Sequence, residues 1–224
     1  MPLFFFACAS CKKVKLKKGD QNISFLALGD SYTIGESVDI DLRWPKQLVK
    51  KLKSQDVLIE PVKIIAKTGW RTDQLLLNAR TVLNESKFDL VALLIGVNNE
   101  FQGETIESFE EKFRKCLAFA IAQARSGEAG VFVLSIPDYG FTPYGAPNQD
   151  KISARIDGYN NICKSVSLEF GVAYFDITAI SRQGLIDTKL VATDNLHPSG
   201  YQYSLWVDRY YQNILGMIQS NLNN

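Results

Sequence analysis

Short, continuous apolar runs alternate along the chain with longer segments in which apolar residues recur every three or four positions. The continuous runs predict buried strands, and the periodic segments predict amphipathic helices. Strands are expected at residues 23–28, 61–66, 90–95, 131–136 and 172–177. Helices are expected at residues 45–52, 72–83, 105–125, 152–170 and 199–219. Thr72 or Asp73 is the expected N-cap of the second helix, Gly171 is expected to end the fourth, and residues 138–150 and 181–195 are expected to be loops.

Five strands that alternate with helices predict an α/β fold of three layers, in which helices cover both faces of a parallel five-stranded sheet. Right-handed crossovers favour a flavodoxin-like sandwich with the strand order 2-1-3-4-5. The length of 224 residues suits one domain. We therefore expect a single domain over residues 21–224, preceded by an apolar and lysine-rich segment at residues 1–20.

That N-terminal segment resembles the end of a bacterial lipoprotein signal, because small residues precede a cysteine after a short apolar run. Ala9-Ser10-Cys11 fits this ending well, and Phe6-Ala7-Cys8 fits it less well. No Lys or Arg precedes the run, so a plain apolar tail on a cytoplasmic protein is the alternative. The resemblance implies membrane attachment through a lipidated Cys11 or Cys8, and a location in the bacterial cell envelope or periplasm.

Charge and cysteine content narrow the function classes. The net charge is +1, but five lysines lie within residues 12–18, which leaves the rest of the chain mildly acidic. A mildly acidic body does not favour nucleic-acid binding. The lysine run is expected to be a solvated linker, and a contact with anionic lipid or nucleic acid is the alternative. Cys8 and Cys11 form a C-x-x-C, a spacing that occurs in thioredoxin-like redox sites and in zinc sites. We expect neither, because the pair follows no strand and two further zinc ligands are missing. Cys116 and Cys163 lie in expected helices as small buried apolar residues, so no disulfide framework is implied.

Polar residues and glycines follow the ends of the expected strands, where ligands bind in sheets of this kind. They lie at Gly29-Asp30-Ser31, Gly69, Gly96-Val97-Asn98-Asn99, Pro137-Asp138-Tyr139 and Asp194-Asn195-Leu196-His197. His197 is the only histidine of the chain, and Asp194 precedes it by three residues. A hydroxyl nucleophile needs a base near neutral pH and a carboxylate that orients this base. The sequence thus predicts Ser31 as nucleophile, His197 as general base and Asp194 as the orienting carboxylate.

At these positions the sequence resembles the SGNH or GDSL hydrolases, whose four sequence blocks occur here in order. Gly29-Asp30-Ser31, Gly69, Gly96-Val97-Asn98 and Asp194 through His197 match the four blocks. The resemblance implies a serine ester hydrolase with an oxyanion hole formed by Ser31, Gly69 and Asn98, and with no metal or organic cofactor. Asn99 departs from the pattern, in which an Asp follows the block-three Asn, and this puts the local loop architecture in doubt. The G-x-S-x-G motif of the unrelated α/β-hydrolases is absent.

The substrate stays open at this stage. A short acyl ester, an acetylated carbohydrate or a lysophospholipid would each suit such a site. Four aromatic residues are expected either to line the pocket or to pack within the protein: Trp70, Tyr139, Phe141 and Tyr144. An acyltransferase that uses the same residues and a catalytically silent binding protein are the alternatives to a hydrolase.

Overall fold

The computed structural model describes residues 22–83 and 86–222. The expectations for residues 1–20, including lipidation at Cys8 or Cys11, lie outside the described residues.

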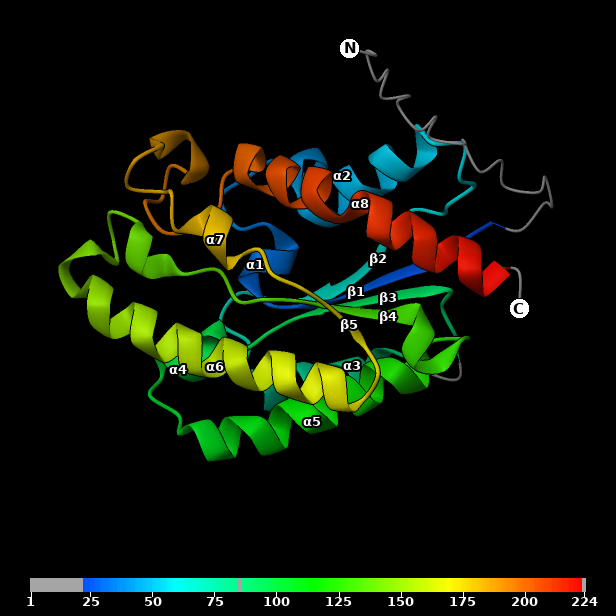
Figure 1. The fold of residues 1–224 in the computed structure, drawn as a ribbon, viewed down its shortest axis with the longest axis horizontal. Helices are drawn as coiled ribbons and strands as arrows, with labels where there is room; N and C mark the ends of the chain where they lie inside the picture. The colour runs from blue at the N-terminus through cyan, green and yellow to red at the C-terminus, as the bar shows by residue number, and fades with distance from the viewer. Residues whose placement is uncertain (1–21, 84–85, 223–224) are drawn as a thin grey trace, which may run out of the picture.

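The core of the fold is one five-stranded sheet in the order β2-β1-β3-β4-β5, with all neighbouring strands parallel (Figure 1). The strands are β1 (Phe25–Gly29), β2 (Lys63–Ala66), β3 (Leu90–Leu94), β4 (Val131–Leu134) and β5 (Ala173–Phe175). Every residue of β1, β3 and β4 is buried, as expected for strands that are covered on both faces. The expected fold class and strand order are confirmed.

Helices form a layer on each face of the sheet. Figure 1 shows α2 and α8 together on one face and α3, α5 and α6 on the other. The helices are α1 (Ser31–Ile34), α2 (Trp44–Lys53), α3 (Thr72–Val82), α4 (Val97–Phe101), α5 (Ile106–Gln123), α6 (Gln149–Glu169), α7 (Thr178–Ser181) and α8 (Gly200–Leu222). The sandwich predicted from the alternation of strands and helices is therefore observed.

Aromatic side chains fill the space between the sheet and each helical layer. On one face, the Phe25 ring lies with its centroid 6.3 Å from that of Trp44 in α2. On the other, Phe109 of α5 stacks on Tyr159 of α6 at 4.3 Å between ring centroids. All four side chains are almost completely buried, and the first pair joins β1 to α2 while the second joins α5 to α6.

Two local expectations are wrong. The N-cap of α3 is Arg71, because the backbone N–H and hydroxyl of Thr72 are both bonded to the Asn99 side chain at 3.1 Å and 2.8 Å. Residues 138–150 are also not a featureless loop. They contain 3₁₀ turns at Tyr139–Phe141 and Ala146–Asn148, and α6 already begins at Gln149.

The end of α6 follows the sequence expectation. Gly171 has a φ of +69° directly after the helix, and Val172 N–H closes the turn onto the Ser167 carbonyl at 2.8 Å. Cys116 and Cys163 are free and buried, which confirms their expected place in the core. No helix within residues 22–83 and 86–222 has the length and apolarity needed to cross a membrane.

Candidate active site

Three strands end at the same level of the sheet and bring three of the sequence blocks together. Gly29 is paired in register with Ala66 of β2 and with Leu94 of β3. The segments that begin at Asp30, Lys67 and Ile95 therefore leave the sheet side by side at its carboxyl edge. This is the edge at which ligands bind in parallel α/β sheets.

Ser31 is the first residue of the short helix α1, directly beyond β1. The turn is held by the Asp30 carboxylate, which accepts a hydrogen bond from Tyr32 N–H at 3.0 Å. Gly29 leaves no space for a side chain, since a Cβ there would lie 2.2 Å from Thr33 Oγ1 and 2.5 Å from the Leu94 carbonyl oxygen. The sharp strand-to-helix turn therefore depends on this glycine, and it places Ser31 at the end of the sheet with 4% of its surface exposed.

Asp30 is completely buried next to Ser31. Burial raises the pKa of Asp30 to about 7, although backbone N–H groups, including that of Tyr32, favour the carboxylate. Its Oδ2 atom has no hydrogen-bond partner among the described residues. Burial therefore disfavours a negative charge on Asp30 next to Ser31.

The Asp194 carboxylate and the His197 imidazole form the pair that the sequence predicts. His197 Nδ1 lies 2.6 Å from Asp194 Oδ2, and Asp194 Oδ1 accepts hydrogen bonds from Leu196 N–H and His197 N–H, each at 2.9 Å. The segment is closed by Ala192 N–H, which donates to the His197 carbonyl at 2.8 Å. The loop therefore holds the Asp194 carboxylate against Nδ1 of the His197 imidazole, just before α8 begins.

Asp194 is strongly biased towards its charged form. Partial burial opposes ionisation, but hydrogen bonds from the Ser37 hydroxyl and from two backbone N–H groups outweigh it and lower the pKa of Asp194 to about 2. Asp194 is consequently a carboxylate at any pH at which an imidazole can act as a base. A carboxylate on Nδ1 leaves Nε2 as the nitrogen that can accept a proton.

The imidazole faces the turn that carries Ser31. The Tyr32 ring lies edge-on to the His197 ring, with 5.8 Å between centroids and 68° between planes. The His197 side chain is 12% exposed, so it stays accessible at the mouth of the site. Within the described part of the chain no hydrogen bond joins His197 to the Ser31 hydroxyl, and such contacts often tighten only when substrate is bound.

Gly69 and Asn98 lie on the two neighbouring segments. Gly69 has a φ of +84°, a conformation that favours glycine, and it is exposed. Asn98 Nδ2 donates to the Trp70 carbonyl at 3.0 Å, which ties α4 to the segment that contains Gly69. The Thr68 hydroxyl donates to the Glu36 carboxylate, which ties the same segment to the turn after α1. The structure therefore places the sequence-predicted residues on adjoining segments.

Asn99, the departure from the family pattern, has a defined role in this loop. It is fully buried, it bonds Thr72 through both its oxygen and its nitrogen, and its Nδ2 also donates to Glu104 Oε2 at 2.7 Å. A carboxylate at this position would have no hydrogen to donate to Glu104. The amide therefore suits this chain, and the loop architecture is intact.

The aromatic residues near the site divide into packing and exposed groups. Tyr139 is buried, and its hydroxyl donates to Glu100 Oε2 at 2.9 Å, so it packs within the protein. Tyr144 is 54% exposed, and its backbone N–H donates to the Asn195 carbonyl at 3.1 Å beside Asp194. Its ring neighbours that of Phe101, which is equally exposed, at 6.4 Å between centroids. Phe101, which the sequence analysis did not single out, thus forms an exposed aromatic pair with Tyr144 beside the Asp194 loop.

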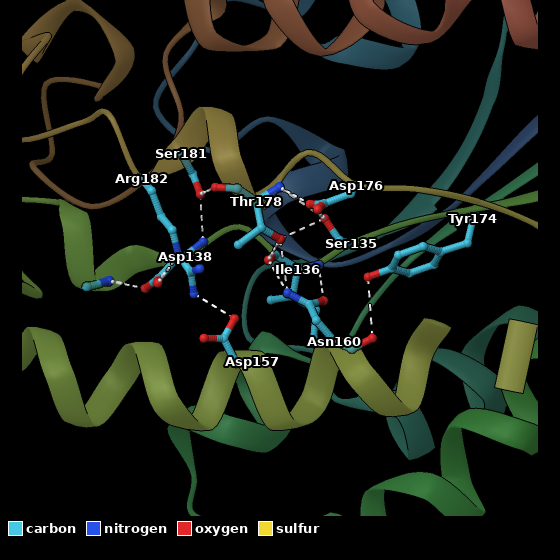
Figure 2. Close-up of polar contacts among 11 residues, drawn as sticks. Ser135, Ile136, Asp138, Asp157, Asn160, Tyr174, Asp176, Thr178, Ser181 and Arg182 are labelled. Carbon is cyan, nitrogen blue, oxygen red and sulfur yellow. Dashed lines mark hydrogen bonds and ion pairs between the residues drawn. The ribbon is translucent and has the colours of Figure 1, made fainter. Parts of the chain in front are cut away.

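A buried polar network lies at the carboxyl ends of β4 and β5, next to the start of the 139–148 loop (Figure 2). Asp138 is fully buried and accepts hydrogen bonds from Gly140 N–H at 2.9 Å and from Arg182 Nε at 2.9 Å. Arg182 also contacts Asp157 on α6 at 2.7 Å. Figure 2 shows Arg182 between these two carboxylates, which links the loop to α6 and α7.

Replacing Arg182 with alanine is expected to destabilise the protein, because Asp138 would stay buried without its cation. We expect a loss of about 2 kcal/mol in the free energy of unfolding, less than for a dry ion pair because water reaches the guanidinium. Urea denaturation measures this loss. Arg114→Ala, which removes the surface pairs with Glu110 and Glu169, is the control and should cost clearly less. Equal losses in both variants would contradict the structural role of the network.

Side chains of the types that bind metal ions do not gather into a cluster among the described residues. Within residues 22–83 and 86–222, no three His, Cys, Asp or Glu side chains come together in a group that could hold a metal ion.

Comparison with known proteins assigns the chain to one family. The family model of the GDSL-like lipase/acylhydrolase family matches residues 27–205. Three solved structures share the fold. A lipase/acylhydrolase from Enterococcus faecalis is 19% identical, with 87% of this chain and 96% of that chain covered and a TM-score of 0.69. The acetylxylan esterase Axe2 from Geobacillus stearothermophilus is 18% identical, with 86% of this chain and 94% of that chain covered and a TM-score of 0.68. The psychrotrophic esterase EstA from Pseudoalteromonas sp. is 17% identical, with 91% of this chain and 100% of that chain covered and a TM-score of 0.66. No curated protein sequence matches the chain.

The matched region covers most of the chain, so the protein belongs to the GDSL-like lipase/acylhydrolase family. As a member of this family it is a hydrolase that acts on ester bonds, and its substrates are small-molecule esters. The family resemblance read from the four sequence blocks is confirmed.

Proposed function

We propose that the protein cleaves carboxylic esters through an acyl-enzyme on Ser31, with His197 as general base and Asp194 as the carboxylate that orients it. The observation that carries the proposal is the 2.6 Å contact between His197 Nδ1 and Asp194 Oδ2, formed beside the strand end that presents Ser31. This contact fixes the imidazole tautomer that has its proton on Nδ1.

The proposed reaction has two halves. Ser31 Oγ attacks the ester carbonyl carbon while its proton passes to His197 Nε2, and a tetrahedral oxyanion forms. The C–O bond to the alcohol then breaks, and His197 returns the proton to the leaving oxygen. A water molecule then gives a proton to the same nitrogen and attacks the acyl carbon. The bond between the acyl carbon and Ser31 Oγ breaks, the acid leaves, and His197 returns the proton to Oγ. Asp194, held ionised by its low pKa, stabilises the imidazolium in both halves.

The oxyanion is proposed to be held by the backbone N–H groups of Ser31 and Gly69 and by the side-chain amide of Asn98. Asn98 Nδ2 carries two hydrogens, and one is used on the Trp70 carbonyl. That bond fixes the amide plane, so the second N–H is held in one direction. A donor that is already oriented stabilises developing charge without reorganisation during the reaction.

Asn98→Ala is expected to lower kcat by about 10²–10³-fold, the usual cost of losing one oxyanion donor. Steady-state hydrolysis of a chromogenic ester measures the effect. The control is Asn78→Ala, which removes an exposed amide whose Nδ2 bonds only the Gln74 carbonyl within α3. A loss of about two-fold, similar to that of the control, would rule out Asn98 as an oxyanion donor.

Short acyl esters are the proposed substrate class, with acetylated carbohydrate as the specific candidate, and lysophospholipid is the alternative substrate. One similar structure is of an acetylxylan esterase, which supports the first of these. The exposed rings of Phe101 and Tyr144 form an open apolar rim beside the Asp194 loop, which suits a flat or short group better than an enclosed long chain. Rates on p-nitrophenyl acetate, butyrate and longer esters test this, and a maximum at long chains would contradict it.

An acyltransferase on the same residues would pass the acyl group to an alcohol instead of water. Adding acceptor sugars or alcohols to the ester assay separates the two functions, because a transferase forms a new ester in proportion to acceptor. Hydrolysis that is unaffected by acceptor supports the proposed hydrolase. No turnover of any ester would favour a silent binding protein.

We also propose a location in the bacterial cell envelope, with attachment through a lipidated Cys11 or Cys8, and a cytoplasmic protein is the alternative. The support is the short apolar run followed by Ala9-Ser10-Cys11. Mass spectrometry of membrane-extracted protein tests the proposal, since an N-terminal lipidated cysteine supports it. Recovery of unmodified Met1 in the soluble fraction would refute it.

A further inference from the structure

Ser37 contacts the same carboxylate oxygen that faces the histidine. Its Oγ donates a hydrogen bond to Asp194 Oδ2 at 2.6 Å, and His197 Nδ1 lies 2.6 Å from that oxygen. Ser37 belongs to the turn that follows α1, 157 positions before Asp194. The bond therefore joins the turn of the proposed nucleophile to the loop of the proposed base.

The two oxygens of Asp194 have different partners. Oδ1 accepts only from the backbone of its own loop, through Leu196 and His197. Oδ2 accepts from Ser37 and lies against the imidazole. Rotation of the carboxylate about its Cβ–Cγ bond is thus limited from outside the loop by Ser37.

The backbone at this contact is in an uncommon conformation. Three non-glycine residues among the described ones have a positive φ, and two of them flank the contact: Ser37 at 62° and Asn195 at 63°. For a residue other than glycine the left-handed region is unfavourable, and such strain persists only where surrounding contacts hold it. The uncommon backbone conformation of Ser37 thus coincides with the hydrogen bond from its side chain to Asp194.

Short-range bonds anchor Ser37 to Ser31. Glu36 N–H and Gly35 N–H both donate to the Ser31 carbonyl, at 3.0 Å and 2.9 Å. The Glu36 side chain in turn accepts from Thr68, one residue before Gly69. Ser37 is therefore held by a turn that is fixed to the proposed nucleophile and to the proposed oxyanion segment.

We propose that Ser37 is a positioning residue, which holds Asp194 Oδ2 against His197 Nδ1 and fixes the base loop relative to Ser31. This inference rests on the proposed function of Ser31, Asp194 and His197. Ser37 is exposed, so water can replace its hydroxyl when it is removed, but a mobile water does not fix the carboxylate in one orientation.

The test compares Ser37→Ala and Ser37→Gly with the wild type. Both variants lack the hydroxyl, but glycine also relieves the positive φ, so the pair separates the hydrogen bond from the backbone strain. Ser165→Ala, which removes an exposed hydroxyl that bonds only the Ile162 carbonyl in α6, is the control. We expect kcat to fall about 10-fold in both Ser37 variants with KM changed less than about two-fold, since orientation and not binding is lost.

The single histidine provides a readout that does not depend on turnover. In protein with ¹⁵N-labelled histidine, all imidazole signals belong to His197. We expect a low-field Nδ1 proton resonance in the wild type and in Ser165→Ala, and its broadening or loss in both Ser37 variants, because a loosened carboxylate lets this proton exchange with water.

A wild-type kcat and an unchanged Nδ1 proton in both Ser37 variants would overturn the inference. Recovery of wild-type behaviour by Ser37→Gly alone would also overturn it, because the backbone and not the hydroxyl would then be responsible. Ser31→Ala, measured in parallel, keeps the two proposals apart. Its full activity would refute the nucleophile, whereas the Nδ1 resonance would still decide the role of Ser37.

Discussion

Replacement of Ser31 with alanine is expected to lower kcat for ester hydrolysis by about 10⁶-fold, as loss of the nucleophile does in another serine hydrolase. The reason is that Ser31 begins α1 directly before Tyr32, whose ring contacts the imidazole of His197, and alanine has no hydroxyl that could form the acyl-enzyme. Ser31 is the first residue of α1, and a shortened side chain there leaves the turn intact. Steady-state rates on p-nitrophenyl acetate, with thermal unfolding as a check of the fold, measure the effect.

The matched control for this variant is Ser204→Ala, which removes an exposed hydroxyl that bonds the Tyr201 carbonyl on α8. It should retain wild-type kcat. If Ser31→Ala keeps more than about one hundredth of the wild-type rate while the control is unchanged, another residue carries the acyl group and the proposed mechanism is wrong.

Asp194→Asn is expected to lower kcat by about 10⁴-fold with little change in the fold, because an amide imposes the wrong imidazole tautomer. The asparagine oxygen can still accept from Leu196 N–H and His197 N–H, as Asp194 Oδ1 does. Its nitrogen then faces His197 Nδ1 and donates to it, so the proton of the imidazole moves to Nε2. A base that already carries its proton on Nε2 cannot accept one from Ser31.

Asp187→Asn is the control for that substitution. Asp187 caps a turn in the same region by accepting from Lys189 N–H at 3.1 Å, and it makes this contact outside the site. Its replacement should leave kcat unchanged. An Asp194→Asn enzyme that retains most of its wild-type activity would show that His197 does not need this carboxylate.

The fold was predictable because its determinants are local in the sequence. Strands such as β1 and β3 are buried on both faces, so they are continuous apolar runs that need no alternation to be recognised. The carboxyl ends of parallel strands meet at one edge, so the strand positions alone place Ser31 and Asn98 near each other. The contact between Asp194 and His197 is similarly local, since three residues and one turn separate the two side chains.

The missed features depend on contacts between distant segments. Ser37 and Asp194 are 157 positions apart, and no periodicity marks a serine whose partner lies in another loop. Asn99 takes the N–H of Thr72, 27 positions away, which moves the N-cap of α3 to Arg71. The helices α1 and α4 have four and five residues, too few to show a helical period.

Covalent labelling with a serine-directed fluorophosphonate, followed by peptide mass mapping, tests whether Ser31 is the nucleophile, because it detects the reactive residue without knowledge of the natural ester. We expect one adduct, on Ser31, that is absent in Ser31→Ala and that forms much more slowly in His197→Ala. An adduct on a different residue, or no adduct on a folded wild-type protein, would contradict the proposed role of Ser31.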